Sequence, residues 1–201
     1  MRTNATAAAL VVAFGLVGGT ARAQGKKFDL RTADGVKAVR GQWRFSDVKI
    51  VETTNKTRDG HVLSTYDFTP KAQSADFDDG AWEVLDPTTL GRPRAGGKVC
   101  FCWYRIKITL PDEVRGKSVF FQTTVDDYGE VWVDGKLPRK GGQSGGAIVA
   151  GFNVPNRLEL NDPAPGKVYS IAIFGINGPI SDAPSNRIFL GNTFLEIRDK
   201  E

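Results

Sequence analysis

The 201-residue chain is poor in cysteine, in histidine and in long apolar runs. Two cysteines do not make a disulfide scaffold, and together with the chain's single histidine they do not complete a zinc site. Lysine and arginine are scattered among the acidic residues with no basic run, so nucleic-acid binding has no support. After the N-terminus, no segment approaches the roughly 20 apolar residues of a membrane-spanning helix. We therefore expect a soluble protein whose function depends on neither zinc nor nucleic acid.

The first 23 residues are predicted to be a signal peptide, 1–23. Arg2 gives a thin positive region, residues 7–19 are apolar, and Ala21-Arg22-Ala23 fits an A-x-A cleavage site. Cleavage would leave 178 residues with 25 basic and 23 acidic side chains, which is enough chain for one domain with a substantial core. We expect a secreted or periplasmic protein with no membrane contact after cleavage; a retained membrane anchor is the alternative.

The remaining chain has the residue pattern of a β-protein. Apolar Tyr104, Ile106 and Ile108 alternate with polar neighbours until Pro111, and Asp134-Gly135 is a dipeptide suited to a tight turn. Strands are predicted over residues 37–45, 48–53, 62–68, 104–109, 118–125, 130–133, 168–174 and 187–197. Glycine and proline separate these strands, and no helical period is sustained. The pattern predicts one all-β sandwich over 36–201, preceded by a flexible N-terminal segment at 24–35.

Several short motifs resemble the galactose-binding-like jelly-roll domain. They are Asp79-Gly80-Ala81-Trp82, Trp103-Tyr104-Arg105, the run from Asp126 to Lys136, and the run from Phe152 to Leu158. Their order and spacing over residues 38–198 are similar to the N-terminal sugar-binding domain of family 2 glycoside hydrolases. They are also similar to an accessory domain joined to gluconolactonase-like β-propellers in bacterial exported proteins. The resemblance implies a jelly-roll β-sandwich that acts beside a catalytic domain.

The two cysteines, Cys100 and Cys102, lie two positions apart on a predicted strand and so face the same side. Their spacing along a strand is about 6.5 to 7 Å, whereas a disulfide brings the Cβ atoms to about 3.8 Å. We expect two buried free thiols, with a disulfide in a distorted strand as the alternative.

One sequence motif is typical of serine hydrolases. Gly142-Gln143-Ser144-Gly145-Gly146 matches G-x-S-x-G, which exposes a nucleophilic serine at a strand-to-helix turn. No amphipathic helix follows this motif, and the only histidine, His61, precedes the serine in a polar turn. We interpret the motif as a surface loop and His61 as an exposed side chain.

Acidic residues also suggest a weak metal site. Asp76, Asp78 and Asp79 precede Gly80 in a spacing that faintly resembles a calcium loop, although the terminal bidentate glutamate is missing. A solvated turn before Trp82 is the simpler interpretation. A structural calcium remains a possibility because sandwiches of the resembled class often hold one; no other cofactor is expected.

Sugar-binding sites combine an aromatic ring with amide, carboxylate and guanidinium groups that hydrogen-bond hydroxyls. The candidate ligand-binding residues are Trp103, Arg105, Asp126, Asp127, Tyr128, Asn153, Asn177 and Asn186. Trp132 is a further candidate, but it and Trp82 are expected mainly in the core. Arg105 has the alternative of pairing with an acidic neighbour, and Asn177 of shaping a turn before Pro179.

The sequence thus predicts an exported, non-catalytic carbohydrate-binding domain that recognises a sugar or another polyhydroxylated ligand. Asp126 and Asp127 are adjacent, and on a strand they would face opposite sides, which does not suit a glycosidase pair. The alternative is a structural or protein-docking module for a separate glycoside hydrolase or gluconolactonase-like enzyme. A small hydrolase using Ser144 is the third hypothesis.

Overall fold

The computed structural model describes residues 25–138, 153–178 and 186–200, and the predicted all-β sandwich is confirmed. Its elements in chain order are β1 (Lys26–Asp29), α1 (Ala33–Ala38), β2 (Trp43–Asp47), β3 (Lys49–Lys56), β4 (Val62–Thr69), β5 (Glu83–Leu85), η1 (Pro87–Thr89), β6 (Arg94–Gly97), β7 (Cys100–Thr109), η2 (Asp112–Val114), β8 (Lys117–Val125), β9 (Tyr128–Val133), β10 (Asn156–Glu159), β11 (Val168–Asn177), β12 (Asn186–Ile188) and β13 (Leu190–Asp199). Within the described ranges, no helix has the length and apolarity to span a membrane.

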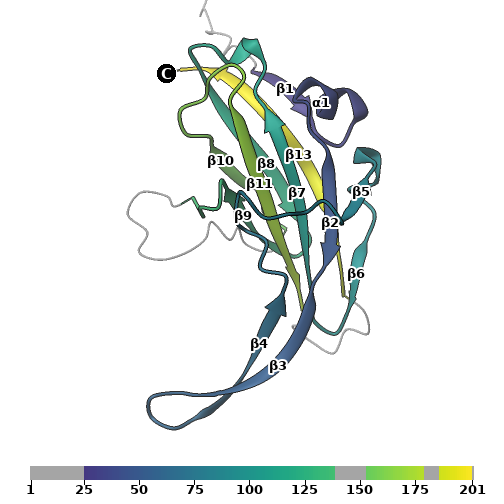
Figure 1. The fold of residues 1–201 in the computed structure, drawn as a ribbon, viewed down its shortest axis with the longest axis vertical. Helices are drawn as coiled ribbons and strands as arrows, with labels where there is room; N and C mark the ends of the chain where they lie inside the picture. The colour runs from purple at the N-terminus through teal and green to yellow at the C-terminus, as the bar shows by residue number, and fades with distance from the viewer. Residues whose placement is uncertain (1–24, 139–152, 179–185, 201) are drawn as a thin grey trace, which may run out of the picture.

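Two antiparallel sheets form the layers of the sandwich (Figure 1). One has the strand order β1-β13-β8-β10 and the other β5-β2-β7-β11-β9. Along β8, Val119, Phe121, Thr123 and Val125 are buried while the residues between them are partly exposed, which is the alternation expected for a strand covering a core. β7 is buried on both of its faces, because one face meets the main core and the other a second cluster.

The second cluster lies on the face of the five-stranded sheet that points away from the main core. Trp103 and Phe174 are at its centre, with ring centroids 4.6 Å apart. Phe77, Trp82 and Trp132 pack against it as partly buried side chains, which for Trp82 and Trp132 agrees with their expected core position. The chain between β4 and β5 therefore closes over this face of the sheet with its own aromatic residues.

A long β-hairpin, β3–β4, forms a separate two-stranded sheet and projects away from the sandwich (Figure 1). We call it the arm. Its turn contains Gly60 at φ 90°, and Gly60 N donates to Thr57 O at 3.0 Å, as in a hairpin whose type I turn ends in a left-handed glycine. His61 lies beside this turn with its side chain 78% exposed, as expected.

The N-terminal part of the domain differs from the expectation. The flexible N-terminal segment predicted at 24–35 is wrong from residue 25 onward, because β1 pairs with β13 and Phe28 and Leu30 are buried. The strand predicted over 37–45 is also wrong in its first half. There, Thr32 Oγ accepts a hydrogen bond from Gly35 N and starts the short helix α1, so the strand begins only at Trp43.

Besides β1, the short strands β5, β6 and β10 were not predicted, and the strand expected at 187–197 is divided into β12 and β13. The other predicted strands correspond to observed ones. The signal peptide and Ser144 lie outside the described residues.

Candidate functional site

The corner between β8 and β9 carries the best-formed group of candidate residues. Asp126 and Asp127 are the two residues that connect β8 in one sheet to β9 in the other, and Tyr128 begins β9. Asn153 comes from a separate segment, and its backbone N–H donates to Asp127 O at 3.0 Å. All three corner residues are partly exposed, and Asn153 is exposed. Four residues whose side chains are suited to hydrogen bonding with hydroxyl groups thus lie together at one end of the sandwich.

Close backbone packing makes this corner possible. Gly129 faces Gly175 across the β9–β11 ladder, and a Cβ on Gly129 would lie 2.5 Å from Val125 Cγ2. A side chain at that position would therefore push β9 away from the end of β8. Asp126 N donates to Phe189 O at 3.2 Å, which ties the corner to the connection between β12 and β13.

The two carboxyl groups interact directly. Burial, the charge of Asp127 and a hydrogen bond with the Asp127 side chain raise the pKa of Asp126, and a hydrogen bond with the Asn153 side chain opposes the rise. The expectation that Asp126 and Asp127 face opposite sides is therefore wrong, because they occupy a corner between sheets and do not continue a strand. Their shared hydrogen bond does not suit a glycosidase pair, whose two carboxyls lie about 5 to 10 Å apart with the scissile bond between them.

Cys100 lies near the same end and is 2% exposed, and Cys102 is fully buried. Both are free thiols, as predicted. Burial raises the pKa of Cys100 to about 11, with Asp127, Asp47 and Asp126 adding to the rise and Arg187 opposing it. The thiol is therefore protonated at neutral pH and does not act as a nucleophile.

Two further candidates, Asn177 and Asn186, hold loops together at this end. The side-chain amide of Asn177 donates to Arg187 O at 2.7 Å, and that of Asn186 donates to Lys98 O at 2.6 Å. Asn177 is only 5% exposed, and its side-chain oxygen has no hydrogen-bond partner among the described residues. Asn177 therefore offers little surface to a ligand, whereas Asn186 stays partly exposed.

The remaining candidates, Trp103 and Arg105, lie within β7 and away from the corner. Trp103 is 1% exposed and donates its indole N–H to Pro70 O at 2.9 Å, so neither face of its ring is open to a sugar. Arg105 is also 1% exposed. Both side chains are buried in the fold and are not accessible to a ligand.

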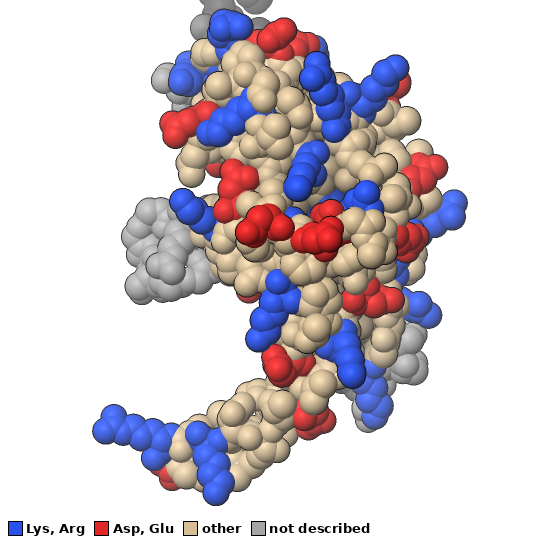
Figure 2. All heavy atoms as spheres, viewed as in Figure 1, with Lys and Arg blue, Asp and Glu red and all other residues tan. Residues whose placement is uncertain are grey.

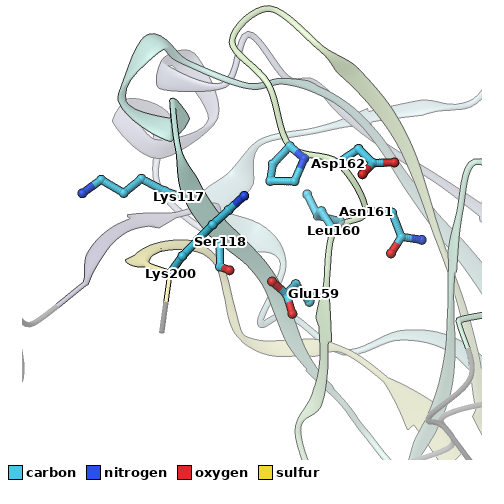
Figure 3. A pocket seen from close by; sticks show the side chains of 8 residues that line it. Lys117, Ser118, Glu159, Leu160, Asn161, Asp162 and Lys200 are labelled. Atoms are coloured by element: carbon cyan, nitrogen blue, oxygen red, sulfur yellow. The ribbon is translucent and has the colours of Figure 1, made fainter.

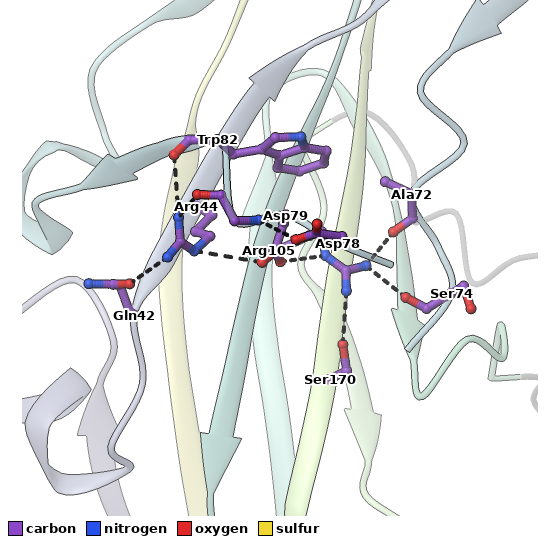
Figure 4. A network of polar contacts seen from close by, with 10 residues as sticks. Gln42, Arg44, Ala72, Ser74, Asp78, Asp79, Trp82, Arg105 and Ser170 are labelled. Atoms are coloured by element: carbon purple, nitrogen blue, oxygen red, sulfur yellow. Dashed lines mark hydrogen bonds and ion pairs between the residues drawn. The ribbon is translucent and has the colours of Figure 1, made fainter. Parts of the chain in front are cut away.

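Arg105 lies instead at the centre of a buried polar network (Figure 4). Its Nε donates to Asp79 Oδ2 at 2.8 Å, and its other nitrogens donate to Ala72 O, to Ser74 O at 3.0 Å and to Ser170 Oγ at 3.3 Å. The other oxygen of Asp79 lies 3.6 Å from Arg44 Nε. Asp79 is therefore held between two guanidinium groups. Arg105 pairs with an acidic residue, which was the alternative considered for it, and that residue is Asp79.

The other two calcium candidates have local partners. Asp78 accepts a hydrogen bond from Gly80 N at 2.9 Å, and Asp76 accepts one from the Ser74 hydroxyl, which lowers the pKa of Asp76. In the described part of the chain, no group of three or more His, Cys, Asp or Glu side chains is arranged to hold a metal ion. The cations that meet this acidic segment are arginine side chains.

The opposite end of the sandwich has a shallow pocket of about 220 Å³ (Figure 3). It is lined by Lys117, Ser118, Glu159, Leu160, Asn161, Asp162, Pro163 and Lys200. None of these residues is aromatic, so the pocket has no ring on which a pyranose could stack. The corner at Asp126 is the stronger candidate for a sugar.

The chain is similar in structure to several much longer enzymes. A β-glucuronidase from Faecalibacterium prausnitzii shares 16% identity over 78% of this chain, with a TM-score of 0.42. A family 2 glycosyl hydrolase from Bacteroides cellulosilyticus shares 15% over 88% (TM-score 0.47), and a β-glucuronidase from Bacteroides uniformis shares 14% over 87% (TM-score 0.45). The chain spans 22%, 21% and 18% of these three proteins.

No protein-family model matches the sequence, and no curated protein is a detectable relative. At identities and TM-scores this low, the similarity assigns neither an activity nor a substrate to this chain.

Proposed function

We propose that this chain is an exported, non-catalytic domain that binds a sugar or another polyhydroxylated ligand at the β8–β9 corner. The main support for this proposal is that four candidate residues from two separate segments lie together there and stay at least partly exposed: Asp126, Asp127, Tyr128 and Asn153. Carboxylate and amide groups accept and donate hydrogen bonds to adjacent hydroxyls, and charge-assisted bonds are the stronger ones. The tyrosine ring supplies the apolar surface on which a sugar ring stacks.

The chemistry of the corner favours binding over turnover. The hydrogen bond between the two carboxyl groups does not suit the separated pair that glycosidases place on either side of a bond. The Cys100 thiol is buried and protonated, and the exposed His61 imidazole lies 3.4 Å from Asp59, on the arm. Neither Cys100 nor His61 is therefore arranged to act as a nucleophile or base on a ligand held at the corner.

The charge of the corner points to a neutral ligand. The raised pKa of Asp126 reflects the neighbouring Asp127 charge as well as burial, so negative charge at the corner is incompletely compensated. A uronic acid would add a third carboxylate and be repelled. Neutral sugars are therefore expected to bind better than their acidic counterparts.

A thermal-shift screen of the mature chain tests the proposal. A ligand at 100 times its dissociation constant stabilises a protein by about 2.7 kcal/mol, which for a domain of this size raises the Tm by about 5 to 10 °C. Matched pairs such as galactose and galacturonate compare neutral with acidic ligands, and each is run with and without calcium.

The shift should disappear in Asp127→Asn and persist in Glu159→Gln, a matched acid-to-amide change in the pocket at the opposite end. A flat response to a broad set of sugars, or a shift that survives Asp127→Asn and is lost in Glu159→Gln, would refute the proposed site.

A further inference from the structure

The arm carries an unusual share of exposed apolar side chains. Seven large hydrophobic residues of the described chain are exposed, and four of them lie on β3 and β4: Val51, Val62, Leu63 and Tyr66. Their exposed fractions run from 45% for Tyr66 to 60% for Val62. On the face seen in Figure 2, the middle of the arm shows no charged side chain between the charged groups at its tip and those near its base. An isolated two-stranded hairpin is only marginally stable in water, so a covered arm would be the more stable form.

The hydrogen-bonding pattern of the hairpin defines an open edge on β4. Thr57 N donates to His61 O at 2.8 Å, which makes these two residues a hydrogen-bonded pair. Hydrogen-bonded and non-hydrogen-bonded pairs alternate along an antiparallel ladder. The next pair, Lys56 with Val62, is therefore non-hydrogen-bonded, and so are the pairs that contain Ser64 and Tyr66. The backbone N–H and C=O groups of Val62, Ser64 and Tyr66 thus point away from β3.

This edge is self-complementary. If two β4 strands pair antiparallel about a two-fold axis at Ser64, Val62 of one copy lies opposite Tyr66 of the other, and both residues use their outward backbone groups. The side chains of Val62, Ser64 and Tyr66 share one face of the arm, so the apolar pairs form side by side across the axis. Leu63 then lies opposite Thr65 on the other face.

Charge favours this register over its neighbour. Asp67 is the only charged residue of β4, and the register centred on Ser64 places it opposite His61 of the second copy. A register centred on Thr65 would instead place Asp67 opposite the exposed Leu63. Edge strands commonly avoid pairing through charge, proline or bulges, and residues 62–66 contain none of these devices.

We propose that the arm mediates self-association, with β4 pairing with β4 of a second copy of this chain in the register centred on Ser64. Pairing would join two hairpins into one four-stranded sheet and cover the exposed Val62 and Tyr66 side chains. One strand edge buries much less than the roughly 800 Å² per partner of a stable interface, so the dimer is weak and forms at high protein concentration. Its two-fold symmetry is the commonest arrangement for homodimers.

Cysteine cross-linking tests the register directly. Ser64 would lie opposite its own copy, at the Cα separation of about 5.5 Å that a disulfide accepts. Thr54→Cys is the matched control, because Thr54 is exposed and pairs with Ser64 on the same face of the arm, but belongs to β3. Under mild oxidation of the full mature chain, Ser64→Cys should form disulfide-linked dimers at least about tenfold faster than Thr54→Cys. The native thiols are buried and do not compete.

Charge insertion provides a second test that needs no cross-link. Sedimentation of the unmodified chain up to several hundred micromolar should show a reversible dimer, and Tyr66→Lys should abolish it. Val51→Lys places the same charge on β3 at a similarly exposed site and should leave the dimer intact. Circular dichroism checks that both variants fold. A monomer throughout, equal cross-linking of the two cysteine variants, or a dimer that persists in Tyr66→Lys would overturn the proposal and leave the arm for a different protein.

Discussion

Removing the carboxylate of Asp79 should unfold this protein at a markedly lower temperature. Asp79 accepts the hydrogen bond from Arg105, whose side chain is 1% exposed, and Arg44 lies 3.6 Å from its other oxygen (Figure 4). In Asp79→Ala the buried guanidinium keeps its carbonyl partners but loses its counter-charge. Breaking a buried pair in this way costs about 3 to 5 kcal/mol. At about 2 to 4 °C per kcal/mol for a domain of this size, the Tm should fall by about 6 to 20 °C.

Differential scanning calorimetry of Asp79→Ala, Asp78→Ala and Asp76→Ala makes the comparison within one segment. Asp78 and Asp76 are exposed and accept their hydrogen bonds from nearby residues, so each of their substitutions should lower the Tm much less than Asp79→Ala does. Calcium should leave all the melting temperatures unchanged. Equal losses in the three variants, or losses seen only with calcium present, would refute the arginine-centred account and favour a metal loop.

Two other outcomes follow from pKa shifts. The folded state raises the pKa of Asp126 above its unfolded value and so binds its proton more tightly, which makes stability fall as pH rises between the two values. Asp126→Asn should therefore raise the Tm at pH 7, and this gain should vanish at pH 3. A lower Tm at pH 7 would contradict the sign. Cys100 and Cys102 should resist a thiol reagent in the native protein and react after unfolding, because both are buried and the pKa of Cys100 is raised to about 11; rapid native labelling at pH 8 would contradict this.

The central strands could be predicted because their patterns are decided locally. In β8, alternate burial follows directly from alternate apolar residues, and proline or glycine marks the ends of its neighbours. The short edge strands carry no such signal. β1 is held by pairing with β13, more than 160 residues away in the sequence. Thr32, which follows β1, is the N-cap of α1, and the strand pattern predicted from residue 37 concealed this helix start. The sequence does contain that start, as a threonine three residues before Gly35.

The candidate site was only partly predictable for a related reason. Asp126, Tyr128 and Asn153 could be chosen by residue type, but only the fold shows that the corner and Asn153 meet. Trp103 and Arg105 have the same residue types and are buried, since the aromatic segment before β5 covers that face of the sheet. Distinguishing an open ring from a covered one requires the tertiary packing. The outward edge of β4 was also hidden, because its exposed apolar residues resemble those of a core strand.

The most direct test of the sugar-binding account is an ¹H–¹⁵N correlation spectrum of the labelled mature chain, titrated with a neutral sugar from the thermal screen. The account predicts that the saturable shifts centre on the amides of Asp126, Asp127, Tyr128 and Asn153 and are absent in Asp127→Asn. Shifts centred on the pocket at Lys117 and Glu159, or no saturable shift at millimolar sugar, would contradict it.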